Sequence, residues 1–170
     1  MDSSNTNGRG IPAAEFYEFK ELSLEEAEKQ LTRFQEFIAK YRFMETSIVR
    51  RVAGLDEKLP EIEKTLQTVT FLEAEQDENL DVLYELDDTL YANAQVTASN
   101  TVCLWLGANV MLEYPVAEAK TLLTSKLEAA KETLKTCKED LEFLRAQITT
   151  MEVNTARVYN HTVELKRRQK

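Results

Sequence analysis

Residues 102–114 read VCLWLGANVMLEY, in which the triplet GAN separates two apolar runs. Gly107 and Asn109 belong to the residue types that most readily adopt a positive φ, so the triplet predicts a tight turn between two strands. A two-stranded hairpin of this size cannot bury Trp105 and its apolar neighbours by itself. The sequence therefore predicts that strands from other chains cover this hairpin.

A second hairpin is predicted immediately before the first. Residues 90–96 alternate apolar and polar side chains, which is typical of a half-buried strand, and residues 83–86 precede them across Asp87-Asp88, a plausible turn. We expect both hairpins to form an oligomerisation surface. Its expected side chains are Leu90, Val96, Val102, Leu104, Trp105, Leu106, Val110, Met111 and Leu112.

On the N-terminal side of the hairpins, a seven-residue apolar repeat runs without interruption from Leu24 to Val69. Only Glu45 is polar among its a and d positions, and such a sustained repeat indicates a coiled-coil seam. Glu45 could fix the register of the helices. We favour the alternative that it reaches out to solvent and that the adaptable Met44 fills the gap.

Ser23 and Glu26 form a capping box, which predicts that the first helix begins here. Pro60 removes one helical hydrogen bond, but the seam keeps its phase across this residue. We therefore expect one kinked helix rather than two separate helices.

On the C-terminal side, a second apolar repeat extends from Leu123 to Leu165, and Pro115 suits the first turn of its helix. The two arms have nearly equal length, so the economical arrangement is an antiparallel pair with Val69 near Val116. The predicted fold is mainly α with a small β part, a long antiparallel two-helix coiled coil joined by two β-hairpins.

This reading divides the chain into five segments. They are a flexible N-terminal tail (1–22), a first coiled-coil helix (23–72), an acidic linker (73–81), the two hairpins (82–114) and a second coiled-coil helix (115–168).

The charges and the reactive residues exclude several functions. The net charge is -9, and residues 70–115 carry nine acidic residues and no lysine or arginine, which argues against nucleic-acid binding. No stretch is long and apolar enough to span a membrane, and no secretory signal is evident, so a cytoplasmic protein is expected. His161 is the one histidine and has no ligand partner at a suitable spacing, so neither a metal site nor a catalytic centre nor a cofactor is expected. Cys103 and Cys137 are expected to be buried.

The whole pattern resembles an α-class subunit of the prefoldin family. Residues 102–114 are similar to the second hairpin of eukaryotic members, as are residues 139–145 and 153–160 to their second helix. The resemblance implies a heterohexamer in which this chain joins one further α-class and four β-class subunits through an intersubunit β-barrel. It also implies that the coiled-coil tips hold unfolded proteins, above all actin and tubulin, and pass them to the cytosolic chaperonin without ATP.

Large apolar side chains outside the seam are concentrated toward the open end of the predicted coiled coil. Exposed apolar surface usually marks interaction, although such residues could also widen the contact between the helices or hold the aromatic side chains of the N-terminal tail. The side chains expected to hold an unfolded protein are Phe34, Phe37, Phe43, Met44, Met151, Val153 and Tyr159. The alternative function is a coiled-coil scaffold or tether that only oligomerises through its hairpins.

Overall fold

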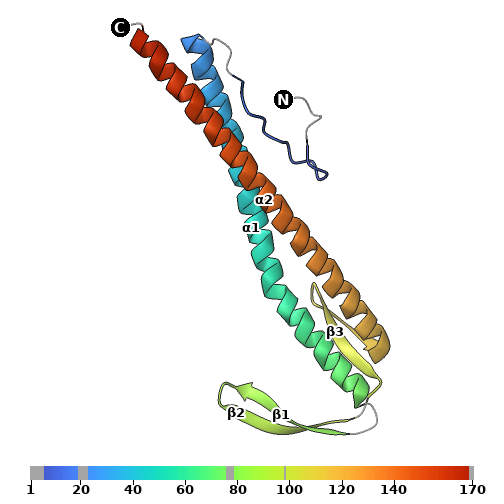
Figure 1. Ribbon diagram of the computed structural model, residues 1–170. Coiled ribbons are helices and arrows are strands. Elements are labelled where there is room, and N and C mark those ends of the chain that lie inside the picture. Colours follow the sequence, from blue (N-terminus) through green and yellow to red (C-terminus); the bar gives the residue numbers. More distant parts are fainter. Residues whose placement is uncertain (1–5, 19–22, 76–78, 98, 169–170) are drawn as a thin grey trace. The chain divides into compact units, whose positions relative to one another are not determined.

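The computed structural model describes residues 6–18, 23–75, 79–97 and 99–168. In chain order, one long helix precedes two antiparallel hairpins and another follows them, which confirms the expected fold class (Figure 1). The elements are α1 (Leu24–Ala74), β1 (Leu80–Asp87), β2 (Leu90–Val96), β3 (Thr101–Gly107), β4 (Val110–Pro115) and α2 (Val116–Arg168). The chain divides into two compact units, of which unit 1 comprises residues 1–54 and 134–170 and unit 2 comprises residues 55–133.

Helix α1 begins with the capping box that the sequence predicts. The Ser23 backbone N–H donates to Glu26 Oε2 (3.0 Å), and the Glu26 backbone N–H donates to Ser23 Oγ (3.4 Å). Side-chain acceptors therefore bond N–H groups that have no partner within the helix. The helix continues through Pro60 to Ala74 as one element, as expected.

The carboxylate of Glu26 should make this helix start sensitive to pH. Hydrogen bonds from the Ser23 hydroxyl and backbone lower the pKa of Glu26 below its usual value. Because the folded pKa is the lower one, the stabilisation is complete above the pKa of an unfolded glutamate and is lost as the pH falls through the folded pKa. The hydrogen-exchange protection factor of the Ser23 amide, which donates to the Glu26 carboxylate, should therefore drop in acid, and Glu26→Gln should abolish that dependence. An equal acid response in the Gln variant would contradict this account.

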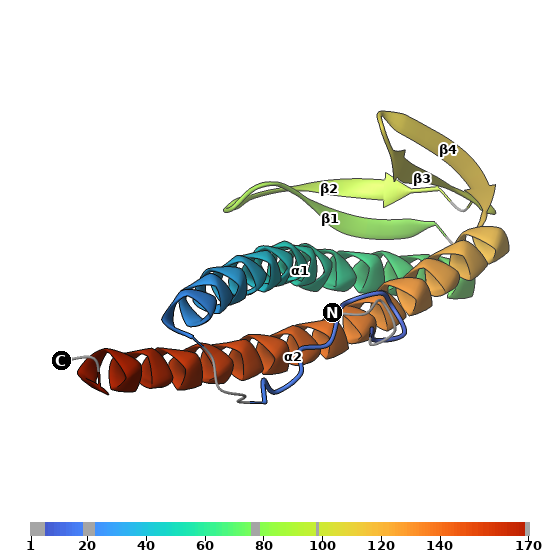
Figure 2. The same cartoon turned by 90° about the horizontal axis from the view of Figure 1, so that it is seen from above.

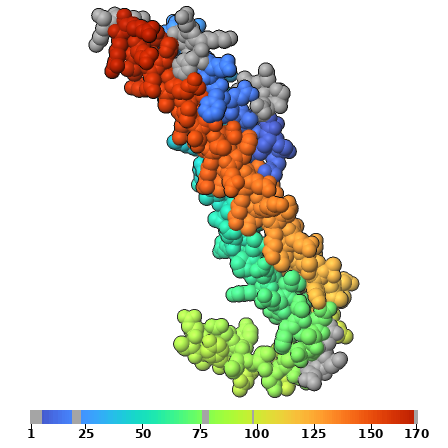
Figure 3. Space-filling model, viewed as in Figure 1, coloured from blue at the N-terminus to red at the C-terminus, as the bar shows by residue number. Residues whose placement is uncertain are grey.

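Residues 6–18 lie along α2 in unit 1, whereas the sequence analysis expects a flexible tail (Figures 2 and 3). The Ala14 and Tyr17 amides donate to side chains of Gln147 and Asn154 on α2. Ala14 and Gln147 are 133 positions apart in the chain, and Tyr17 and Asn154 are 137 positions apart. No local sequence pattern therefore predicts these contacts. The rest of the expected tail lies outside the described residues.

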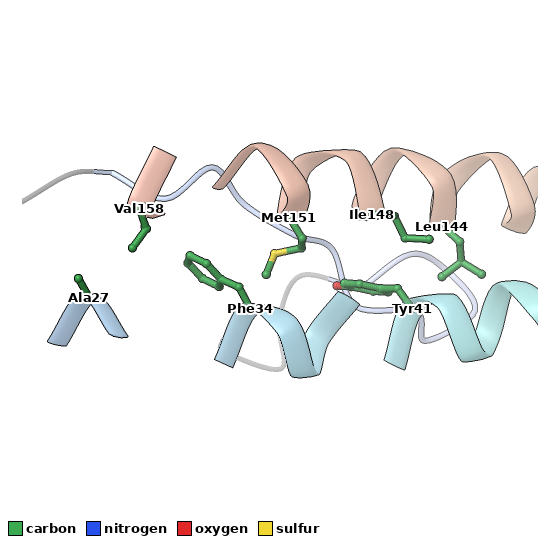
Figure 4. Close-up of a cluster of buried hydrophobic side chains, with 7 residues drawn as sticks. All are labelled: Ala27, Phe34, Tyr41, Leu144, Ile148, Met151 and Val158. Atoms are coloured by element: carbon green, nitrogen blue, oxygen red, sulfur yellow. The ribbon is translucent and has the colours of Figure 1, made fainter. Parts of the chain in front are cut away.

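The core of unit 1 is one seam of side chains from the two antiparallel helices (Figure 4). Nearly all its members occupy d positions of the two predicted repeats, and Tyr41 and Leu144 are among the largest fully buried side chains. Cys137 is also buried, as predicted. The members of the core are Ala27, Phe34, Tyr41, Leu144, Ile148, Met151 and Val158.

Glu45 lies at the edge of this core, where its Oε1 accepts a hydrogen bond from Arg145 Nε (3.0 Å). Met44 is partly buried and packs against the core. The carboxylate thus binds a cation on the other helix while the methionine packs beside it, so the structure is compatible with both interpretations of this polar seam residue.

Unit 2 has its own core, in which the second hairpin packs on both helices. Leu104 of β3 lies among Val69 of α1 and Val116 of α2, so the expected proximity of these two valines is confirmed. The Val116 N–H donates to the Asn100 carbonyl (3.0 Å), which ties the start of α2 to the start of β3. The remaining core members are Ala119 and Leu123.

The turn between β3 and β4 contains more positive φ angles than expected. Gly107 (φ 91°) and Asn109 (φ 64°) adopt them as predicted, but Ala108 does so too (φ 49°). A two-residue turn of type I′ requires a positive φ at both central positions. Ala108 therefore adopts a left-handed conformation, at a cost of about 1–2 kcal/mol.

Pro115 ends β4 instead of starting α2, which begins at Val116. It pairs with Thr101 at the end of the β3–β4 ladder. A proline fits at a strand end because its missing N–H interrupts no further ladder bond there.

Candidate functional site

The two hairpins form separate two-stranded sheets, β1–β2 and β3–β4, and no third strand joins either sheet within the described parts of the chain. Every strand is therefore an edge strand with unpaired backbone N–H and C=O groups on one side. Such edges are templates for pairing with strands of another chain.

Exposure alternates along β3 and divides its side chains into two sets. Leu104 is buried in the unit 2 core, whereas the neighbouring Trp105 is 59% exposed. Trp105 pairs directly with Met111 on β4, which is also exposed, and directly paired residues lie on the same face of a sheet. The hairpin thus presents a large aromatic ring and a flexible thioether together on its uncovered face.

Most of the expected oligomerisation residues are uncovered in the single chain. Those exposed are Leu90, Val96, Trp105, Val110, Met111 and Leu112, while Val102 and Leu106 are half-buried and Leu104 is buried. Further apolar side chains, on β1 and at the start of β2, are exposed but were not among the expected residues. They are Val82, Leu83, Tyr84, Leu86 and Tyr91. The many apolar residues in this predicted strand were the signal that could have identified them.

Cys103 is exposed, so the expectation that it is buried is wrong for the single chain. The period of two along β3 places its side chain on the same face as Trp105 and on the opposite face from the buried Leu104. Its exposure therefore follows that of the Trp105 face.

The thiol of Cys103 should report directly on whether this face becomes covered. In the isolated chain, iodoacetamide should modify Cys103 much faster than Cys137, which is buried. When partner subunits cover the hairpin, modification of Cys103 should slow by about tenfold or more, because alkylation requires access to the sulfur. Mass spectrometry of the digested chain measures both rates. Equal modification of Cys103 before and after assembly would contradict coverage of this face.

The residues expected to hold an unfolded protein separate into three groups in unit 1. Phe34 and Met151 are core residues, and Phe37 and Met44 are partly buried against that core. Phe43 (78% exposed), Val153 and Tyr159 are exposed. Phe43 and Val153 occupy f positions, opposite the seam, so the exposed group does not form one continuous face.

Cations flank the ring of Phe37. The Arg33 guanidinium lies 5.7 Å from the ring centroid and Lys40 Nζ lies 5.5 Å from it. Such cation–π contacts hold the ring at the surface of α1 while its inner edge packs on the core.

Two further features escaped the sequence analysis. Phe71 is exposed on α1 in unit 2, and an aromatic residue at a non-seam position was the available signal. Asp140, Gln147 and Asn154 recur every seven residues on α2, and each bonds the N-terminal segment. A polar repeat with the period of the seam was the signal for the second feature.

Within the described residues, no group of three or more His, Cys, Asp or Glu side chains could hold a metal ion. The helices of this part of the chain also include none that is long and apolar enough to cross a membrane.

Comparisons with known proteins agree with this architecture. A family model described as prefoldin subunit matches residues 41–161. A protein of Schizosaccharomyces pombe named probable prefoldin subunit 3 is 66% identical over 167 residues, covering 98% of this chain and 99% of the relative. Prefoldin subunit 3 of Mus musculus is 40% identical, covering 100% of this chain and 91% of the relative.

The fold also resembles a solved structure. A chain of the filamentous prefoldin from Methanocaldococcus jannaschii superposes with a TM-score of 0.54 at 16% sequence identity. The match covers 70% of this chain and 98% of that chain. At this identity the likeness concerns the fold alone.

Proposed function

Because this chain belongs to the prefoldin family, we propose that it is an α-class subunit of a heterohexamer with one further α-class and four β-class subunits. Prefoldin subunits are chaperone subunits rather than enzymes, and they assemble with other prefoldin subunits. The presence of two hairpins supports the α class, for which the resemblance implies four strands. In the assembly, the hairpins join strands of neighbouring subunits in an intersubunit β-barrel.

The assembled complex acts as an ATP-independent holdase in the cytoplasm. Unit 1 of this chain contacts unfolded proteins, above all actin and tubulin, which are then passed to the cytosolic chaperonin. The observation that carries this proposal is the set of exposed apolar side chains on both helices of unit 1, where the internal seam is already complete without them. Exposed apolar groups of this kind offer surface that an unfolded chain can bury.

Replacing Phe43, Val153 and Tyr159 together by Gln should weaken the capture of unfolded actin while leaving assembly intact. All three side chains lie outside the core, so helix content should change little. Each replacement removes at most about 1.5–3 kcal/mol of potential apolar burial. The loss should be partial, because the other arms of a hexamer bind the same client.

The measurement is the binding of labelled, chemically unfolded actin to wild-type and variant complexes at equal concentration. Phe71→Gln is the matched control, since this exposed aromatic residue lies in unit 2. Unchanged affinity in the triple variant would contradict a client-binding role for these residues.

The alternative function is a passive scaffold. The core of unit 1 forms without any bound protein, so it is also compatible with a scaffold that holds no client. Suppression of the aggregation of denatured actin by the complete complex separates the two functions. A holdase suppresses aggregation without ATP, and a scaffold leaves it unchanged.

A further inference from the structure

The N-terminal strap, residues 6–18, is bound to a row of polar side chains that runs along α2 beside the seam. This polar stripe consists of Asp140, Gln147 and Asn154, which share one heptad position. The Ala14 N–H donates to Gln147 Oε1 (2.8 Å), and the Tyr17 N–H donates to Asn154 Oδ1 (2.9 Å). Strap and stripe run in the same direction, so the contacts follow each other in order along both.

The spacing of these contacts follows from the geometry of an extended chain on a helix. Seven residues of an α-helix rise about 10.5 Å, and three residues of an extended chain span about 10 Å. Gln147 and Asn154 are seven residues apart, while Ala14 and Tyr17 are three apart. An extended polypeptide that follows the backbone path of the strap can therefore present one backbone N–H to each of these side chains.

Asn154 binds the strap in the way that a neighbouring β-strand would. Its Oδ1 accepts from the Tyr17 N–H, and its Nδ2 donates to the Glu15 carbonyl (2.8 Å). In a parallel sheet, one residue bonds the N–H of residue i+1 and the C=O of residue i−1 of its neighbour, which is the same pattern. The side-chain amide is only 1% exposed, so its donor and acceptor are aimed at the strap rather than at solvent.

The floor beside the stripe supplies apolar contacts and one more backbone contact. The ring of Tyr17 meets that of Phe34 edge to face, with their centroids 5.6 Å apart. The Tyr41 hydroxyl, whose pKa burial raises, donates to the Pro12 carbonyl (3.0 Å). A hollow of about 370 Å³ adjoins the strap, and Phe37 and Met151 are among its lining residues. The strap therefore leaves room for further apolar side chains.

Charged contacts hold the other end of the strap. Arg9 Nε donates to Asp140 Oδ1 (2.6 Å), and the Arg9 guanidinium also reaches Glu139. The Asn7 side chain donates to the same Asp140 oxygen (3.2 Å). These are the only sequence-specific polar contacts to the stripe among the described residues of the strap; the others engage its backbone.

We infer that the polar stripe and its apolar floor form a binding site for extended polypeptide, which the strap occupies in cis and which a segment of unfolded client occupies in its place. The inference rests on the proposed holdase function. A site that binds backbone N–H and C=O groups suits clients of unrelated sequence that can adopt the strap's path, since these groups are present in every polypeptide. The strap competes with clients because a short connection gives it an effective concentration on the order of mM.

The test uses hexamers reconstituted with either the full chain or a chain that lacks residues 1–18. The probe is a fluorescent synthetic peptide with the sequence of residues 7–18, NGRGIPAAEFYE. It should bind the truncated complex at least about tenfold more tightly than the full complex, where the strap competes in cis. Absence of binding to the truncated complex would overturn the site.

Backbone recognition is tested with methylated peptides. N-methylation at Ala14 and Tyr17 removes both donors to the stripe and should weaken binding by about tenfold or more. N-methylation at Ala13 and Phe16 is the matched control, because these amides donate no hydrogen bond among the described residues. Equal affinities of the two methylated peptides would contradict recognition of the backbone.

A second variant keeps the test valid if truncation disturbs unit 1. Ala14→Pro in the full chain removes the donor to Gln147 without changing the walls of the site, and Ala13→Pro is its control. Ala14→Pro should raise the affinity for the peptide severalfold, whereas Ala13→Pro should not. Circular dichroism verifies that both variants retain their helices.

A further experiment with a client protein measures whether excess unlabelled peptide displaces chemically unfolded actin from the truncated complex. Displacement supports the inference. Binding of the peptide without displacement would mean that clients do not use this site, which overturns it. If no form of the complex captures actin, the proposed function fails, while the peptide measurements still report on the site itself.

Discussion

Replacing Trp105 and Met111 together by Ala should abolish incorporation of this chain into the complex while leaving the isolated chain folded. Trp105 is more than half exposed in the single chain, so its removal there costs little. If partner strands bury it completely, truncation costs about 3–5 kcal/mol, and loss of Met111 adds to this. Since each 1.4 kcal/mol is tenfold in affinity, assembly should weaken by at least about a hundredfold.

Co-expression with partner subunits followed by size-exclusion chromatography measures this loss. Phe43→Ala is the matched control, because it removes an even more exposed aromatic ring from unit 1. The control should assemble normally. Normal assembly of the double variant would mean that the Trp105 face is not the oligomerisation surface.

Replacing Leu144 by Ala should destabilise unit 1 by about 2–5 kcal/mol, because it opens a cavity at a fully buried position. Glu142→Ala on the same helix is the matched control, since Glu142 is exposed. Hydrogen exchange should accelerate in residues 24–54 and 134–168, with much smaller changes in the hairpins. Client capture should fall while assembly persists.

A different pattern of exchange would contradict this account. Equal acceleration in β3 and β4 would show that the chain unfolds as one cooperative body, rather than through the two cores centred on Leu144 and Leu104.

The parts of the fold that the sequence predicts are those with local causes. The capping box requires only Ser23 and Glu26, and the seam repeats every seven residues, so both can be recognised in the printed sequence. The turn at Gly107 and Asn109 is equally local. Ala108 was missed because its conformation is imposed by the geometry of the turn rather than by its own preference.

The candidate sites were harder to predict because exposure depends on distant partners. Phe34 and Met151 pack within the seam and not at the surface, because both occupy d positions. The heptad repeat in the sequence already indicates this placement. Cys103 was expected to be buried because its neighbours are apolar, but the period of the strand turns it away from Leu104. Contact between the tail aromatics and the helices was one alternative from the sequence, and Tyr17 packs on Phe34 accordingly. The polar contacts of the strap were missed because their partners on α2 are far away in the chain and the composition of the strap resembles that of a flexible tail.

The central claim is that this chain uses its hairpins for assembly and unit 1 for holding unfolded protein. Hydrogen–deuterium exchange of the chain alone, in the complex, and in the complex with chemically unfolded actin tests both parts in one measurement. We predict that residues 101–115 become protected on assembly and that residues in unit 1 become protected only when actin is added. Protection of the hairpins by actin, or no protection of unit 1 in any state, would contradict the account.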